Sequence, residues 1–306
     1  MASCAHPHYA LDLGINPENG NKKIKFIGFR PDLSSLKQLQ ARYGESPVIS
    51  LPCGYCIQCR INYAKEWAVR CVLEALEHEN NYFITLTYDD DHLPKDGALH
   101  REDIQKFLKR FRKAFGPVRY FGCGEYSPLG RPHFHLILFG AKIPDLAPDR
   151  FGHLKSHVFA KVWPFGVYDI GEVNYASCNY VAQYSTKKVF KPPVEGKAKE
   201  FIMCSNRPGI GASWMEKNLK HVLDYDRVFG SFGSAMMPRY FEKVAERLDK
   251  GRFDKLKKDR LCKDNSFVIN EMLVHQFDEV EKLLEYKEKI TLDDFIHRKR
   301  GIRKEL

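Results

Sequence analysis

The chain lacks the features that mark a membrane protein, a secreted protein or a nucleotide-driven motor. None of its 306 residues belong to an apolar run long enough to cross a bilayer, and the N-terminus has no signal-peptide core. No G-x4-G-K-[ST] sequence occurs, so a P-loop ATPase is excluded and no nucleotide cofactor is expected. Internal repeats are absent as well. We therefore expect no membrane partner.

Basic and aromatic side chains, by contrast, are plentiful. Lys and Arg total 49 against 39 Asp and Glu, which gives a net charge of +10, and 13% of the residues are aromatic. Phosphates can supply the counter-charge for such a surplus, and aromatic rings stack on bases. The composition favours a nucleic-acid partner, although charge alone also fits a basic protein without one.

Two histidines, His133 and His135, lie in a segment that otherwise reads as a buried strand. Because side chains alternate across a strand, both imidazoles share one face. If this strand forms a hairpin with the preceding one, symmetric about Leu129, Glu125 faces His133 within about 5.5 Å at Cβ. Two imidazoles and a carboxylate suit Mn²⁺ or Mg²⁺. Taken alone, the two histidines fit a half-buried strand without metal equally well.

Two tyrosines follow in a segment predicted to be a helix over about 176–189. Tyr180 and Tyr184 are four positions apart and so lie on one helical face, which Lys187 shares. A phenol, with an ordinary pKa of about 10, needs a nearby cation or an activated electrophile to act as a nucleophile. With the metal ligands, the pair predicts an enzyme that cuts and rejoins DNA through a phosphotyrosine. In isolation it fits an amphipathic helix.

Three of the nine cysteines, Cys53, Cys56 and Cys59, stand in a C-x2-C-x2-C pattern. With Cys4, or with a histidine of the same N-terminal stretch, they would complete a tetrahedral structural zinc site. An iron–sulfur cluster is the alternative, but the expected fourth Cys followed by Pro is missing. Free thiols remain equally open. The odd, clustered cysteines indicate metal more than disulfides and a reducing, cytoplasmic compartment.

Apolar periodicity predicts the other elements. Helices are expected over 60–78, 101–115, 238–264 and 271–289, and strands over 23–28, 82–88, 118–125, 133–139, 167–170 and 201–204. Residues 1–59 otherwise read as irregular. The helix over 101–115 has a basic face that either contacts DNA phosphates or is simply solvated; it consists of Lys106, Lys109, Arg110 and Lys113.

Three motifs stand in a fixed order: Phe83-Ile-Thr-Leu-Thr87, Pro132-His-Phe-His135 and Tyr180-Val-Ala-Gln-Tyr184 with Lys187 and Lys188. This set resembles the replication initiator of the Microviridae, most closely the gokushovirus branch, within the HUH (His-hydrophobic-His) endonuclease superfamily. Four further stretches share the resemblance, which covers about residues 1–215: Cys4–Pro7, Pro52–Arg60, Gly124–Tyr126 and Arg207–Gly211.

The resemblance implies an α+β fold. HUH domains have a central antiparallel sheet with helices in the split βαβ manner of an RNA-recognition motif, with the histidines on a central strand and the tyrosine helix across the sheet's exposed face. We accordingly expect a Cys-rich segment over 1–60, a nickase domain over 61–215 and a helical C-terminal extension over 216–306.

The resemblance also implies rolling-circle replication in the cytoplasm of a bacterial host. One tyrosine cleaves single-stranded origin DNA, keeps the 5′ phosphate and leaves a 3′-OH for the host polymerase; the second later cleaves the regenerated origin, and the strand is circularised. A host helicase is expected, because the chain has no ATPase motif. A lysine three residues past the nucleophile is common in the superfamily, and Tyr184 has it in Lys187 whereas Tyr180 has Gln183. Lys188 and Arg207 are expected to contact DNA.

Two other interpretations compete. A transposase or plasmid relaxase would use the same histidines, but the paired tyrosines and the lack of a large extra domain favour the phage initiator. A non-catalytic nucleic-acid-binding module would display aromatic residues on a similar sheet. Nothing in that role requires two histidines on one strand face and two tyrosines on one helix.

Overall fold

A computed structural model of the chain describes residues 4–16, 22–28, 38–39, 41–44, 46, 48–183, 197–260, 285–286, 288–294 and 296. The residues fall into two compact units, one formed by 63–250 and the other by 1–62 with 251–306. The domain boundaries expected at 60 and 215 stay predictions. Within the described residues, no helix is both long enough and apolar enough to cross a membrane.

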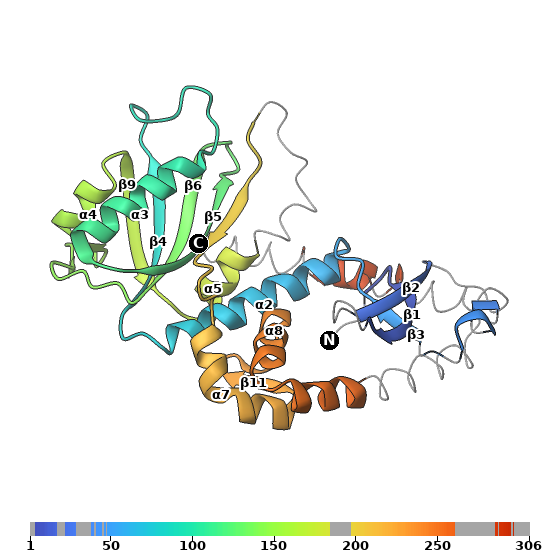
Figure 1. The fold of residues 1–306 in the computed structure, drawn as a ribbon. Coiled ribbons are helices and arrows are strands. Elements are labelled where there is room, and N and C mark those ends of the chain that lie inside the picture. Colours follow the sequence, from blue (N-terminus) through green and yellow to red (C-terminus); the bar gives the residue numbers. More distant parts are fainter. Residues whose placement is uncertain are drawn as a thin grey trace. The chain divides into compact units, whose positions relative to one another are not determined.

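The larger unit is built on a five-stranded antiparallel sheet in the order β10-β5-β6-β4-β9 (Figure 1). The strands are β4 (Asn81–Tyr88), β5 (Arg119–Tyr126), β6 (Pro132–Phe139), β9 (Gly166–Glu172) and β10 (Phe201–Cys204). The central strand β6 is apolar at nearly every position, as a strand covered on both faces must be. The sheet confirms the expected mixed α+β class with antiparallel strands.

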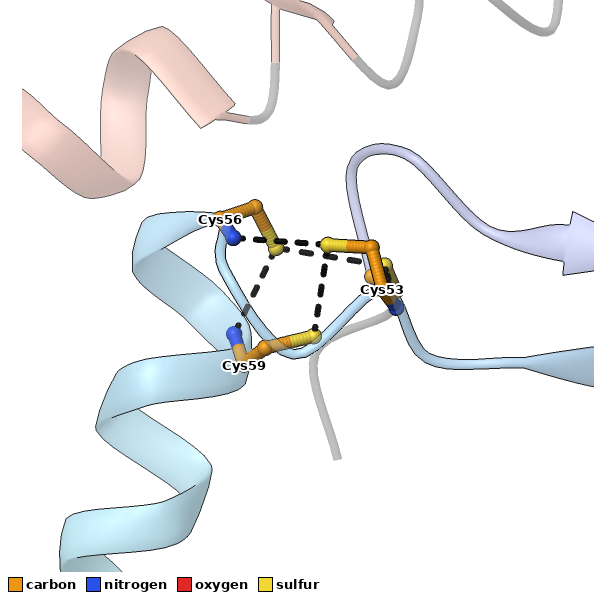
Figure 2. A group of neighbouring side chains, drawn as sticks. Cys53, Cys56 and Cys59 are labelled. Carbon is orange, nitrogen blue, oxygen red and sulfur yellow. Dashed lines mark hydrogen bonds between the residues drawn. The ribbon is translucent and has the colours of Figure 1, made fainter. Parts of the chain in front are cut away.

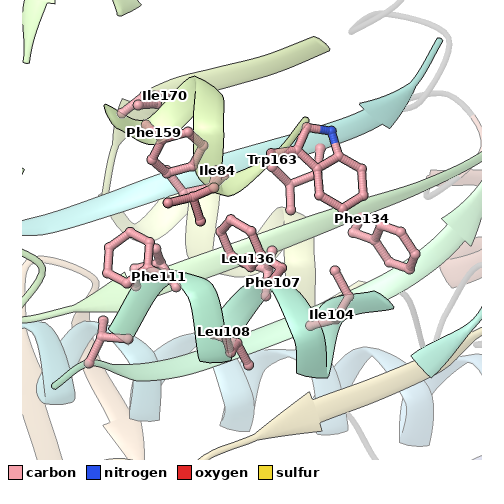
Figure 3. Packing of buried hydrophobic residues seen from close by; sticks show 14 of the residues in the cluster. Ile84, Ile104, Phe107, Leu108, Phe111, Phe134, Leu136, Phe159, Trp163 and Ile170 are labelled. Carbon is pink, nitrogen blue, oxygen red and sulfur yellow. The ribbon is translucent and has the colours of Figure 1, made fainter. Parts of the chain in front are cut away.

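One face of the sheet is covered by α3 (Arg101–Phe115) and α4 (His157–Val162). The helix α3 places its apolar stripe, with Ile104, Phe107 and Phe111, on the sheet residues Phe134 and Leu136 (Figure 3). Acidic residues in its first turn and basic residues in its last complement the helix dipole. The helix ends at Gly116, whose φ of 89° suits glycine.

The opposite face is covered by α2 (Ile57–Ala75) and α5 (Tyr175–Ala182). Buried Cys178, Val181 and Ala182 of α5 pack on this face, together with buried side chains of α2 from Ala64 onward. The helix α5 begins with a capping box between Asn174 and Ser177, which satisfies backbone N–H groups at its first turn. Its start is therefore fixed firmly on the sheet.

The chain continues past the sheet into further helices. The helices α7 (Ala212–Tyr225) and α8 (Arg239–Leu248) pack on each other, and between them in sequence runs a hairpin of β11 (Arg227–Gly230) and β12 (Gly233–Met236). Residues 250–260, most of which belong to the smaller unit, are also helical. The expected C-terminal extension is thus helical with one hairpin; its helix over 271–289 lies largely outside the described residues. A short β7 (Ala147–Pro148) and β8 (Leu154–Lys155) pair elsewhere.

The N-terminal part is more regular than its composition predicts. The strand β1 (His8–Ile15) pairs with both β2 (Lys22–Gly28) and β3 (Val48–Leu51) to form a three-stranded antiparallel sheet. Only β2 was expected, so the description of residues 1–59 as otherwise irregular is wrong. The reason is that Ala10 and Leu11 of β1 are fully buried by long-range pairing, which local apolar periodicity does not reveal.

Candidate functional site

Three potential metal ligands meet on the α5 side of the sheet. The hairpin of β5 and β6 pairs Glu125 with His133, as the assumed symmetry about Leu129 predicts. The Nε2 atoms of His133 and His135 both lie 3.2 Å from Oε1 of Glu125. Ligand atoms about 2.1 Å from one ion at right angles would be separated by about 3 Å. The three atoms therefore have the spacing of a facial set around one divalent cation.

Hydrogen bonds orient both imidazoles. The Nδ1 atom of His133 lies 3.2 Å from the carbonyl oxygen of Arg131, which can only accept, so Nδ1 carries the proton and Nε2 keeps its lone pair. The Nδ1 atom of His135 lies 3.1 Å from the hydroxyl of Thr85 on β4. Glu125 and His135 are buried and His133 is partly so. A largely dry carboxylate beside two neutral imidazoles attracts a cation strongly.

The helix α5 brings Tyr180 to these ligands. The ring of Tyr180 meets the ring of His135 edge-on, with centroids 5.1 Å apart, and its side chain is 44% exposed. Phe83 completes the group: its ring lies parallel to His135 at 5.6 Å and edge-on to Tyr180 at 6.2 Å. The expected orientation of this helix, with Val181 buried and Tyr180 facing outward, is found here. Tyr184, Lys187 and Lys188 lie outside the described residues.

A glycine in β5 permits the close approach of the ligand strand. A Cβ atom on Gly122 would lie 2.7 Å from the carbonyl oxygen of His135. Any larger residue would push β5 away from β6 and separate Glu125 from the histidines. Sequence reasoning gave no role to this glycine, although a glycine inside a strand signals close backbone approach.

The cysteines form a second group in the smaller unit (Figure 2). The Sγ atoms of Cys4 and Cys56 are 3.9 Å apart, as are those of Cys53 and Cys59. A tetrahedron of four Zn–S bonds of about 2.3 Å has edges of about 3.8 Å. Backbone N–H groups of Cys53, Cys56 and Cys59 donate to sulfurs of the group. Cys4 thus takes the fourth position, for which the sequence left alternatives, while His6 contacts Glu288 at 2.8 Å.

The environment of these sulfurs acts on their protonation in two directions. Burial raises the pKa of the Cys4 thiol to about 11, and burial raises the pKa of Cys59 as well. Burial also raises that of Cys56, but backbone N–H groups of Cys59 and Ala5 donate to its sulfur and bring its pKa below the ordinary value. Backbone donors aimed at sulfur stabilise thiolates, the form in which cysteine binds metal.

The stretch Arg207–Gly211 is anchored by a buried carboxylate. Glu74 of α2 accepts a hydrogen bond of 2.6 Å from the N–H of Gly211 and pairs with Arg119 at the start of β5. Arg119 also donates to the carbonyl of Pro208 at 2.9 Å. Arg207 itself is exposed, as a DNA contact would require. Sequence reasoning missed Glu74, because its partners lie far along the chain.

The basic residues of α3 lie apart from the metal ligands. This helix covers the sheet face opposite to the one that carries His133 and His135. Lys106, Lys109 and Lys113 are exposed. Arg110 is partly buried, donates to the carbonyl of Val162 at 2.8 Å and lies over the ring of Phe165. Arg110 therefore has a packing role, whatever its three neighbours contact.

A mixed sheet-and-helix unit with a candidate divalent-cation site and an adjacent tyrosine defines a class of possible nucleic-acid-processing proteins, and comparison with known proteins narrows it. A family model of replication-associated proteins of the ORF2 type matches residues 81–189, which include β4, β5, β6, β9 and α5. No solved structure matches the chain significantly.

Three phage proteins are similar over about two thirds of the chain. The replication-associated protein ORF2 of Spiroplasma virus 4 is 33% identical over 221 residues, which are 65% of this chain and 68% of the relative. The replication-associated protein VP4 of Bdellovibrio phage phiMH2K is 31% identical over 210 residues, 63% of this chain and 66% of the relative. The replication-associated protein ORF4 of Chlamydia phage 1 is 30% identical over 220 residues, 65% of this chain and 54% of the relative. The chain belongs to this family of phage replication-associated proteins, which confirms the predicted resemblance to phage replication initiators.

Proposed function

We propose that this protein is a rolling-circle replication initiator that nicks and rejoins single-stranded DNA at the phage origin through a 5′-phosphotyrosine, in a domain of the HUH type. The observation that carries the proposal is the meeting of Glu125, His133 and His135 beneath the ring of Tyr180. The order of motifs and the family membership support it. The five-stranded antiparallel sheet, with the histidines on its central strand, suits the HUH fold.

The three ligands fit Mg²⁺ or Mn²⁺. The set is one carboxylate and two imidazoles whose Nε2 atoms converge on Oε1 of Glu125. A divalent ion bound there would draw charge from the phosphate oxygens of the scissile nucleotide. The protein's own contribution is to hold the ligands in place and to present the tyrosines on a helix anchored by its capping box. A displacement of about 1 Å would remove much of that advantage.

In the proposed reaction the phenolic oxygen of Tyr180 or Tyr184 attacks the phosphorus atom. A new O–P bond joins the tyrosine to the 5′ phosphate, the bond to the 3′ oxygen breaks, and the phenol's proton leaves to give a free 3′-OH. Reversal by the 3′-OH of a second cleaved end restores the phosphodiester and the phenol. Lys187 would neutralise charge that develops beside Tyr184. The host polymerase would extend the 3′-OH, and a host helicase would separate the strands.

We further propose that Cys4, Cys53, Cys56 and Cys59 hold a structural zinc ion. The sulfur separations and the three backbone donors support this assignment. Backbone N–H groups that point at sulfur favour a thiolate metal site over free thiols. The small three-stranded sheet of the same unit buries few large apolar side chains, so a metal would contribute much of its stability.

The deciding experiment incubates the full chain with Mn²⁺ and single-stranded oligonucleotides that tile the cognate phage genome. We expect a covalent adduct that resists denaturation, with the protein on the 5′ phosphate of the cleaved strand. Tyr184→Phe should slow first cleavage more than Tyr180→Phe, by up to about 100- to 1000-fold, because Tyr180 has only Gln183 where Tyr184 has a lysine. Either variant should lose strand circularisation.

Controls separate the chemistry from binding. The double tyrosine variant should form no adduct, and His135→Ala should cleave nothing while it binds single-stranded DNA nearly as well as the wild type, because basic and aromatic contacts supply the affinity. Peptide mapping of the adduct identifies the modified tyrosine. Full cleavage by His135→Ala would overturn the metal assignment. Reversible binding without any adduct would mean a non-catalytic nucleic-acid-binding module.

A further inference from the structure

The motif Phe83-Ile-Thr-Leu-Thr87 has no part in the chemistry proposed above, yet it forms the strand next to the metal ligands. On β4, Phe83, Thr85 and Thr87 alternate with buried Ile84 and Leu86, which pack on the opposite face under α3. Thr85 pairs directly with His135 in the register between β4 and β6. The separation of 3.1 Å between its Oγ1 and Nδ1 of His135 is a hydrogen bond.

An imidazole that ligates a cation through Nε2 must carry its proton on Nδ1. For His133 the carbonyl of Arg131 enforces this state, because a carbonyl accepts and never donates. For His135 the facing group is the hydroxyl of Thr85, which can accept the Nδ1 proton when the cation occupies Nε2. A partner of this kind fixes the ring orientation and the tautomer of a metal-bound histidine.

Contacts from its face and its edges restrict the same ring further. Phe83 lies parallel to His135, with an interplanar angle of 8°, and Tyr180 meets it at 89°. His135 is only 6% exposed, so water cannot readily replace a lost partner at Nδ1. The stacking by Phe83 leaves the ring free to turn in its own plane, and the hydroxyl of Thr85 is the contact that opposes this rotation.

We propose that Thr85 is a positioning residue for the cation site: its hydroxyl accepts the Nδ1 proton of His135 and thereby aims Nε2 at the ion. This inference rests on the proposed function, since it concerns the same metal. It gives the first motif of the family a defined role, which is to orient a ligand that belongs to the second motif.

The test compares Thr85→Val with Thr87→Val. Valine keeps the shape and strand preference of threonine but removes the hydroxyl. Thr87 provides a matched control, because it lies on the same strand face, pairs with His133, and its hydroxyl makes no hydrogen bond among the residues that the structure describes. Mn²⁺ affinity is measured by electron paramagnetic resonance on the DNA-free full chain. The tautomer of His135 is read from ¹⁵N chemical shifts in Mg²⁺.

We expect Thr85→Val to weaken Mn²⁺ binding about 10- to 100-fold, the usual effect of losing a ligand's hydrogen-bond partner, with Thr87→Val within about twofold of wild type. Thr85→Ser should restore most of the affinity. In the Mg²⁺-loaded wild type, Nδ1 of His135 should be protonated, and excess Mn²⁺ should recover cleavage by Thr85→Val. If either valine variant fails to fold, the serine variants at both positions and the wild-type tautomer still decide.

The two proposals fail in different ways. A wild-type chain that binds Mn²⁺ and cleaves DNA, with Thr85→Val equal to Thr87→Val in affinity, overturns the role of Thr85 and leaves the nickase intact. A proton on Nε2 of His135 in the Mg²⁺-loaded protein does the same. A wild-type chain that binds no Mn²⁺ and forms no adduct overturns both.

Discussion

Replacing Glu74 by Gln should destabilise the larger unit far more than its conservative size suggests. The carboxylate is 2% exposed and has donors at both oxygens. Oε2 accepts from the N–H of Gly211 at 2.6 Å, while Oε1 faces Arg119 and lies 3.3 Å from Nε2 of His78. Glutamine has only one oxygen. Its NH2 group must therefore face either the N–H of Gly211 or the guanidinium of Arg119, and one of these donors loses its acceptor.

The magnitude follows from that count. A buried donor without an acceptor costs about 1–3 kcal/mol, and breaking a buried ion pair costs about 3–5 kcal/mol. The Arg119 side chain is 23% exposed and keeps its bond to the carbonyl of Pro208, so water and this carbonyl offset part of the ion-pair cost. We expect a loss of about 2–4 kcal/mol in the free energy of unfolding. For a domain of this size that lowers the Tm by about 5–15 °C.

The assay is urea unfolding followed by tryptophan fluorescence, with Glu216→Gln as the control. Glu216 also pairs with an arginine, Arg247, at 2.6 Å, but both side chains are about half exposed or more, at 45% and 64%. Such a surface pair contributes about 0–1 kcal/mol. If Glu74→Gln and Glu216→Gln have unfolding free energies within about 0.5 kcal/mol of each other, Glu74 does not anchor the stretch around Gly211, and the reasoning from burial fails.

Two further predictions concern metal and DNA. Metal analysis should find about one zinc per chain apart from the catalytic ion, and Cys56→Ser should lose it whereas Cys204→Ser, outside the cysteine group, should retain it; a zinc-free chain that is folded and active would contradict the assignment. Reversing Lys106 and Lys109 to Glu should lower affinity for single-stranded DNA and flatten its salt dependence by about 0.7 in log–log slope per lost phosphate contact. An unchanged slope would mean that this face of α3 is simply solvated.

The sequence by itself determined the parts whose information is local. The apolar stripe of α3 predicted a helix over 101–115, and α3 has those limits. The spacing of His133 and His135 placed both on one strand face, because alternation is a property of any strand. The short connection to the preceding strand set the register, and Glu125 does pair with His133. A short hairpin has few possible registers, which is why this long inference succeeded.

Only the tertiary structure decided the contacts between distant segments. It chose Cys4 as the fourth member of the cysteine group, paired β1 with β3, and placed Thr85 against His135 and Glu74 against Gly211. It also put the basic residues of α3 on the sheet face away from the metal ligands. These outcomes depend on strand order and on which helix covers which face. Both follow from burying all the apolar surfaces of the chain together, a condition that no single segment contains.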